Sequence, residues 1–220
     1  MASKARNAFD QSCQDINRLL EIHGKEGVQA KGRRFQLEVL NKSAIVLIAA
    51  VWEAYCEDIV GEGIEHLVVH SASASFLSKT IRKAIANELK CDKDELAIWQ
   101  IADNGWKAVL KSRLTRMQEV RARKLNTPKS ENIRLLFSDG LGIDDISKGW
   151  KWEKMSSDQA AKKLDNYITL RGEIAHRGAA ATAVTKYDVE DFLNHVKRLV
   201  AKTGKQVNQY VKQNTGKSLW

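Results

Sequence analysis

The residues best suited to chemistry lie in the segment Leu170–Gly178, which carries an arginine, a glycine and a histidine at close spacing. If the segment is helical, Arg171 interrupts an apolar stripe, and His176 lies about 140° around the helix and about 7.5 Å further along it. A guanidinium on a core-facing stripe costs free energy unless an anion or hydrogen-bond acceptors meet it. We therefore expect a partner for Arg171, either a carboxylate of this protein or the phosphate of a ligand.

Gly172 lies one turn before His176 on a small, polar face of the same predicted helix. A glycine inside a helix costs about 1 kcal/mol relative to alanine, and either function or a close helix contact would explain that cost. Without a side chain, Gly172 leaves room for something to approach His176. The alternative is structural: Arg171 forms a buried ion pair, and His176 caps a helix or packs.

Glu53 is the candidate within the chain to meet Arg171. It follows the longest all-apolar run, Ala44–Trp52, on a helix face where an unpaired carboxylate would be costly. We expect Glu53 and Arg171 to pair across the core near a cleft. The alternative is that the helix turns Glu53 to solvent.

Sequence motifs of other enzyme classes are missing: there is no H-E-x-x-H, no G-x-S-x-G after a strand and no dinucleotide-binding fingerprint. His66 and His70 have the spacing of zinc ligands, but no third ligand accompanies them, so we interpret them as surface residues. The three cysteines form no C-x-x-C pair, so neither a disulfide scaffold nor a cysteine zinc site is indicated. We expect no metal and no cofactor.

A strongly basic helix is predicted over residues 106–124. Such a helix could follow an RNA backbone by displacing its counterions, whereas the alternative is a solvated face that aids solubility. For Trp150 and Trp152, in the loop predicted over 143–155, a place in the core or a dimer contact is favoured over stacking on bases. The predicted RNA-binding residues are Lys107, Lys111, Arg113, Arg116, Arg121 and Arg123.

The elements that must position these residues are helices. The 220 residues include 36 Lys+Arg, 27 Asp+Glu, 13 Gly and one Pro, with a net charge of +9, so turn signals are few. Ser156 and Gln159 form a capping box, and Pro128 suits a first helical position. Helical periodicity predicts helices over 3–23, 33–60 with a possible extension to 71, 75–90, 93–102, 106–124, 157–177 and 188–211. A further short helix is predicted to begin at Pro128 and to stop at the turn over 139–142.

We therefore predict an all-α helical bundle with additional short helices. The second helix is apolar on every side and belongs at its centre. A single domain is expected over residues 1–220, with a tail of about 212–220 that frays. The start of the chain lacks the apolar core of a secretory signal, and no apolar run reaches the roughly 20 residues that span a bilayer. No membrane insertion and a cytoplasmic location are expected.

Three segments resemble HEPN domains. LRGEIAHRG, from Leu170 to Gly178, looks like their L-R-x-x-I-A-H helix. The run Ala49–Tyr55 is similar to the apolar-then-E-x-Y signature of the RiboL-PSP-HEPN and MAE_28990-type branches, and residues 132–143 are similar to their N-I-x-x-L-F … G-I stretch. Arg18 and His23 share the spacing of Arg171 and His176, but only the second pair has this context.

The resemblance implies an all-α domain of a superfamily rich in metal-independent ribonucleases, which form homodimers with facing motif helices. It implies that His176 acts as general acid or base and that Arg171 stabilises charge on the phosphate, with Glu53 and Gly172 in support. RNA is then the substrate, and a toxin or antiviral defence role is expected, with an antitoxin or defence-system protein as a possible partner.

The family usually has a polar residue directly after the arginine, where this chain has Gly172. That departure favours the alternative of a non-catalytic HEPN module that binds RNA or protein. A third option is a helical scaffold in which Arg171 and His176 are purely structural.

Overall fold

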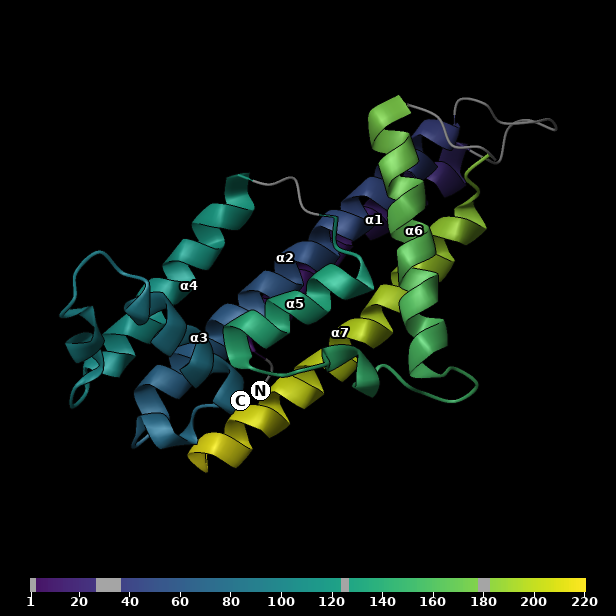
Figure 1. The fold of residues 1–220 in the computed structure, drawn as a ribbon. Helices are drawn as coiled ribbons and strands as arrows, with labels where there is room; N and C mark the ends of the chain where they lie inside the picture. Colours follow the sequence, from purple (N-terminus) through teal and green to yellow (C-terminus); the bar gives the residue numbers. More distant parts are fainter. Residues whose placement is uncertain (1–2, 27–36, 124–126, 178–182) are drawn as a thin grey trace.

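Helix α2 runs through the centre of the computed structural model, and the other long helices pack around it (Figure 1). The structure describes residues 3–26, 37–123, 127–177 and 183–220. Its α-helices are α1 (Lys4–Glu26), α2 (Glu38–His70), α3 (Lys79–Lys90), α4 (Gly105–Arg123), α5 (Ser130–Leu141), α6 (Ser157–Arg177) and α7 (Lys186–Thr215). Short 3-10 helices occur at η2 (Ala74–Phe76), η3 (Ala97–Ile101) and η4 (Ile146–Gly149).

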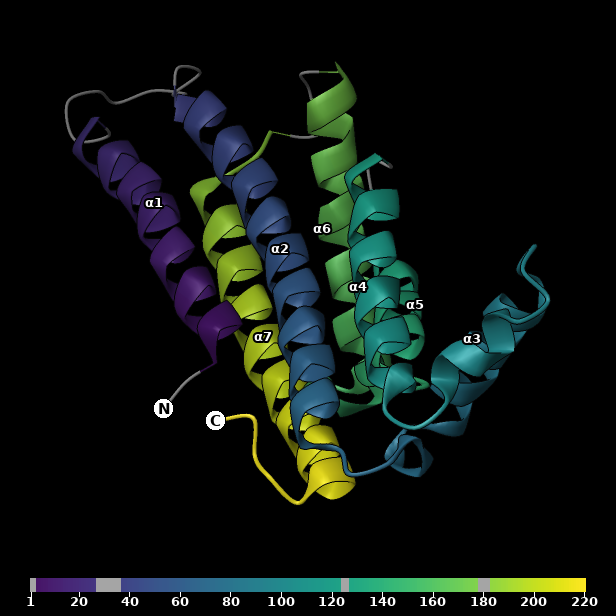
Figure 2. The same cartoon turned by 90° about the vertical axis from the view of Figure 1, so that its left-hand side faces the viewer.

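The central position of α2 follows from its apolar surface. Ile45, Ile48, Trp52 and Ile59 are fully buried, because α1 covers one side of the helix and α4, α5 and α6 lie on the other (Figure 2). Helix α7 packs along α2 as well. Gly63 makes room for this packing, since a Cβ there would lie 2.8 Å from the side chain of Leu141 on α5.

The predicted all-α fold is confirmed. The described residues contain no β-strand, only an isolated bridge between Trp152 and Met155. None of the described helices combines the length and apolarity that a membrane crossing needs.

Trp150 belongs to the core, as predicted. Its side chain is fully buried, its indole N–H donates to Thr203 Oγ1 at 2.9 Å, and its ring meets that of Trp52 edge-on. Trp152 is half-buried between His195 and Arg198, whose side chains lie 5.5 Å and 5.7 Å from its ring centre. Trp150 is therefore not available for stacking on bases.

Two predicted helix ends differ from the structure. Pro128 lies two residues before α5 instead of opening it, because Asp165 of α6 caps this helix from outside: the backbone N–H and the hydroxyl of Ser130 both donate to its carboxylate at 2.7 Å. The helix predicted over 93–102 is largely turns and reduces to η3. In both cases a side chain satisfies backbone donors that a regular first turn would leave to solvent.

Helix α7 extends beyond residue 211, where the sequence pattern places its end. Helix α7 continues to Thr215, and Gly216 then reverses the chain with a φ of +73°. The returning segment is tied down by hydrogen bonds, among them one from the Leu219 backbone N–H to Asn208 Oδ1 at 2.7 Å. His66 Nε2 lies 3.1 Å from the Lys217 carbonyl oxygen, so this histidine is a buried anchor and not the surface residue expected.

Candidate functional site

Helix α6 carries the Arg171–His176 pair, and its first two-thirds are packed into the bundle. The capping box forms as predicted, since the backbone N–H of Gln159 donates to Ser156 Oγ and that of Ser156 donates to Gln159 Oε1. Ala160, Leu164 and Ile168 repeat every fourth residue and are fully buried. This apolar stripe fixes the rotation of α6 against its neighbours.

Polar contacts lock the same part of α6 to α7. The Tyr167 hydroxyl donates to Asp191 at 2.6 Å, and the Lys163 ammonium pairs with the other oxygen of that carboxylate at 2.7 Å. His195 Nε2 lies 3.0 Å from the Ala160 carbonyl oxygen, and burial lowers the pKa of this imidazole to about 4. With the Asp165 cap on α5, these contacts hold α6 on two sides.

The last two turns of α6 are much less enclosed. Ile174 is the one buried residue beyond Ile168 on this helix, while His176 and Arg177 are exposed. Figure 1 shows the C-terminal end of α6 at the end of the bundle opposite the marked N and C termini. The rigid part of α6 therefore presents a tip that solvent and ligands can reach.

Arg171 lies where the packed and open parts of α6 meet. The side chain is half-buried and its Nε atom is fully enclosed, yet that atom has no hydrogen-bond partner. Glu53 on α2 is half-buried, and its expected pairing with Arg171 stays a prediction. An enclosed guanidinium nitrogen without an acceptor is costly, so an acceptor brought to this nitrogen would stabilise the protein.

Gly172 faces open space. A Cβ built at this position would meet no atom within 4 Å, which excludes a close contact with another helix of the described chain as the reason for the glycine. Asp165, Thr169 and His176 share its face of α6 by helical spacing. The absent side chain thus leaves the approach to His176 clear.

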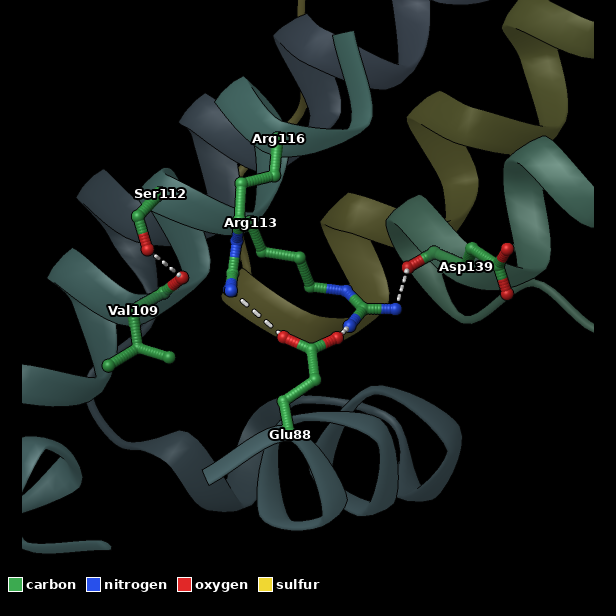
Figure 3. Close-up of polar contacts among 6 residues, drawn as sticks. All are labelled: Glu88, Val109, Ser112, Arg113, Arg116 and Asp139. Carbon is green, nitrogen blue, oxygen red and sulfur yellow. Dashed lines mark hydrogen bonds and ion pairs between the residues drawn. The ribbon is translucent and has the colours of Figure 1, made fainter. Parts of the chain in front are cut away.

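The basic helix α4 is less available than its sequence suggests. Figure 3 shows Glu88 of α3 reaching up between Arg113 and Arg116, and it forms an ion pair with each guanidinium. Arg113 also donates to the backbone carbonyl of Asp139 on α5 at 3.5 Å. Two of the predicted RNA-binding cations therefore hold α4 to its neighbours.

Of the other four predicted RNA-binding cations on α4, two have side chains that the structure describes. Lys111 is exposed, whereas the Lys107 ammonium lies 5.5 Å from the centre of the Trp106 ring. The side chains of Arg121 and Arg123 lie outside the part of the chain that the structure describes. Of the six predicted positions, Lys111 is thus the clearest candidate for contact with a polyanion.

His66 and His70 lie side by side on α2. Their rings are 4.5 Å apart, but no group of three or more potential metal ligands occurs among the described residues. Burial is the main cause that lowers the pKa of His66, and the neighbouring His70 lowers it further. His66 contacts the returning C-terminal segment at Thr215 Oγ1 and the Lys217 carbonyl oxygen, whereas His70 contacts the His66 ring.

A family model described as RiboL-PSP-HEPN matches residues 11–209, from the middle of α1 to near the end of α7. The chain belongs to the RiboL-PSP-HEPN family. Neither the curated proteins nor the solved structures include a significant match to it. The family expected from three short segments is thus confirmed over nine-tenths of the chain, and an RNase-like or RNA-related role follows from it.

Within this HEPN domain, sequence reasoning missed the residues that hold the motif helix. Asp165 and Asp191 each receive two polar contacts from other segments, 24 to 35 residues away along the chain. Asp165 offered a weak signal, since it lies on the same face as His176. The sequence gives no sign of the role of Asp191, because its partners lie on a different helix.

Proposed function

We propose that this protein is a metal-independent endoribonuclease of HEPN type that acts as a homodimer. Arg171 and His176 are its catalytic residues. One observation carries the proposal: on a rigidly held helix of a HEPN chain, an enclosed arginine nitrogen without an acceptor lies beside an open, exposed histidine face. Everywhere else on α6, polar groups of this kind have partners within the chain.

The chemistry needs a base, an acid and a positive charge. A base removes the proton of the RNA 2′-hydroxyl, the 2′-oxygen attacks phosphorus, and the bond from phosphorus to the 5′-oxygen breaks as an acid protonates that oxygen. His176 serves as the base or the acid, a role that contributes about 10²–10⁴-fold. Arg171 supplies its N–H groups to the pentacoordinate phosphate, whose negative charge gives Arg171 the acceptor it lacks.

A second copy completes the site. Because Arg171 and His176 diverge by about 140° on one helix, a single α6 cannot direct both at one phosphate, whereas two facing α6 helices can. Gly172 lets the two helices or the RNA approach closely. Glu53 is proposed to support the site from α2, which packs against α6.

The biological setting proposed for this activity is a toxin or an antiviral defence component in the cytoplasm. An antitoxin or another protein of the defence system would then restrain the nuclease. Cell growth provides the readout, because expression of an unrestrained ribonuclease arrests growth and His176→Ala relieves that arrest.

The direct test is RNA cleavage by the purified protein in the presence of EDTA. Wild type is expected to cleave, and His176→Ala is expected to lose at least about 100-fold of the rate. His23→Ala is the matched control, because Arg18 and His23 repeat the same spacing on α1. Equal rates for wild type and His176→Ala would remove the assignment.

The second candidate is a non-catalytic HEPN module that binds RNA or a protein. The observation that favours it is Gly172, which stands where the family usually has a polar residue. Salt-sensitive RNA binding without cleavage by wild type would select this candidate. If the wild type neither binds nor cleaves RNA, the remaining option is a helical scaffold in which Arg171 and His176 are structural.

A further inference from the structure

The segment around η3 exposes large apolar side chains to an unusual degree. Leu96 is 67% exposed and Trp99 is 71% exposed, and Ile98 and Ile101 beside them are each 37% exposed. Apolar side chains gathered on a surface mark interaction sites, and tryptophan is the residue type that most often dominates binding energy there. We name residues 92–103 the η3 knob.

Acidic residues surround the apolar centre of the η3 knob. Asp92, Asp94, Glu95 and Asp103 are exposed, with Lys93 as the one cation among them. The knob is therefore negative in a chain whose net charge is +9. None of these carboxylates forms an ion pair with another described residue, so their charge is available to a partner.

Helix α3, which packs against η3, carries the opposite charge. Ile81, Ile85 and Leu89 face the core, while exposed cations line another side of the helix. No ion pair engages these cations within the described ranges. The cationic flank consists of Lys79, Arg82, Lys83 and Lys90, and the exposed Phe76 lies just before it.

We propose that the η3 knob docks on a second copy of this chain, with the knob of each copy covering the α3 flank of the other. A two-fold contact needs a surface that is complementary to itself. The acidic η3 knob and the cationic α3 flank meet that condition. A two-fold axis that passes between them places the knob of each copy on the flank of the other, so that opposite charges meet at two equivalent places. Charge complementarity selects the orientation, and burial of Trp99 and Leu96 stabilises it.

This contact is separate from the proposed α6 dimer. Figures 1 and 2 both place α3 at a distance from the C-terminal end of α6. The two contacts together would join copies into an assembly larger than a dimer. Because the η3 knob and the α3 flank are short segments, we expect a weak contact with an affinity in the micromolar range.

Cys91 gives the contact its own probe. It is exposed between the α3 flank and the η3 knob, close to the expected axis, whereas Cys13 and Cys56 are buried. A short bismaleimide cross-linker should therefore join two copies through Cys91 alone. Cross-linking on a denaturing gel, together with sedimentation velocity at micromolar concentration, measures the contact.

Wild type is expected to yield a cross-linked dimer that is absent in Cys91→Ser. Trp99→Ser combined with Leu96→Ser should weaken the association about thirtyfold, the loss typical of a central tryptophan. Tyr187→Ser is the matched control, because Tyr187 is 72% exposed and lies on α7. It should leave the Cys91 cross-link unchanged.

Charge exchange tests the orientation. Lys83→Glu and Glu95→Lys should each weaken cross-linking, and a mixture of the two variants should restore it between unlike copies. A wild type without Cys91 cross-linking, or a cross-link that survives Trp99→Ser with Leu96→Ser, would overturn the proposal. His176→Ala should keep the cross-link, so failure of the proposed nuclease and failure of this contact are distinguishable.

Discussion

The arginines of α4 and of α6 carry the same charge in very different surroundings. Arg113 and Arg116 share the Glu88 carboxylate, and Arg113 also reaches a backbone carbonyl of α5. The Nε atoms of Arg113 and Arg171 are both enclosed without a hydrogen-bond partner, but Arg113 has the Glu88 carboxylate at its other guanidinium nitrogens. A dense run of cations can therefore be structural, so charge alone does not mark a ligand site. The proposal that Arg171 meets an external anion depends on its place on the apolar stripe of α6.

The largest expected effect is on the rate of RNA cleavage, which should depend on Arg171 of α6 and not on Arg116 of α4. Arg171→Gln should lower the single-turnover rate of RNA cleavage by about 10²–10³-fold, because a charge-stabilising donor is lost from the transition state. Arg116→Gln should change the rate by less than about threefold, since exposed and paired charges contribute little. Comparable losses in both variants would remove the distinction between them.

The next effect concerns how the free energy of unfolding depends on pH, through the buried His195 that packs against the first part of α6. Burial is the main cause that lowers its pKa to about 4, below the unfolded value, so the folded protein binds fewer protons than the unfolded one. Its stabilisation is complete above the unfolded pKa of about 6.5 and is lost as the pH falls toward 4, by up to about 3 kcal/mol.

His195→Gln keeps a donor for the Ala160 carbonyl and removes this titration. Urea unfolding of both proteins at neutral and acidic pH measures the difference. The free energy of unfolding should fall more steeply with acid in wild type than in His195→Gln. Parallel pH profiles would mean that His195 does not titrate abnormally.

Loss of the shared carboxylate on α3 should have a smaller effect. Glu88→Gln leaves the Arg113 side chain, which is 12% exposed, without its anion, and should cost about 1–2 kcal/mol of unfolding free energy. Glu190→Gln is the control, because its pair with Lys186 is exposed on α7 and should contribute less than about 0.5 kcal/mol. Equal costs would show that the Glu88 cluster is not structural.

The smallest effect is expected at Gly172. Because a Cβ there meets nothing within 4 Å, Gly172→Ala should stabilise the helix by about 0.5–1 kcal/mol while it slows RNA cleavage. Gly63→Ala is the contrast, since its Cβ would press on Leu141 and destabilise the fold. A Gly172→Ala protein with wild-type cleavage would show that this face is not approached.

Much of the fold was predictable because local patterns decide it. The apolar run Ala44–Trp52 leaves α2 no side to expose, and the Ser156 and Gln159 box sets the start of α6. The wrong ends depend on contacts between distant residues. Asp165 caps α5 from 35 residues away, and Asn208 holds Leu219 beyond the end of α7, neither of which a helical period reveals.

The residues of the proposed site come from the sequence pattern and stay a prediction, whereas their surroundings are known only from the structure. The stripe on α6 identified Arg171 as the unusual member, and the open space at Gly172 agrees with the role inferred for it. The availability of charges was not predictable, since Glu88 neutralises α4 cations through a contact across 25 to 28 residues. Charge counted along a chain does not reveal which carboxylate lies opposite.

The exposure of Trp99 gives this protein an intrinsic optical reporter. Trp52 and Trp150 are fully enclosed and should emit at short wavelength, out of reach of a quencher such as acrylamide. Trp99 is 71% exposed, against 38% for Trp220, and should dominate the long-wavelength emission. Any molecule that covers η3 would shift the red part of the fluorescence and shield it from the quencher. Occupancy of that surface can thus be followed in solution without a label.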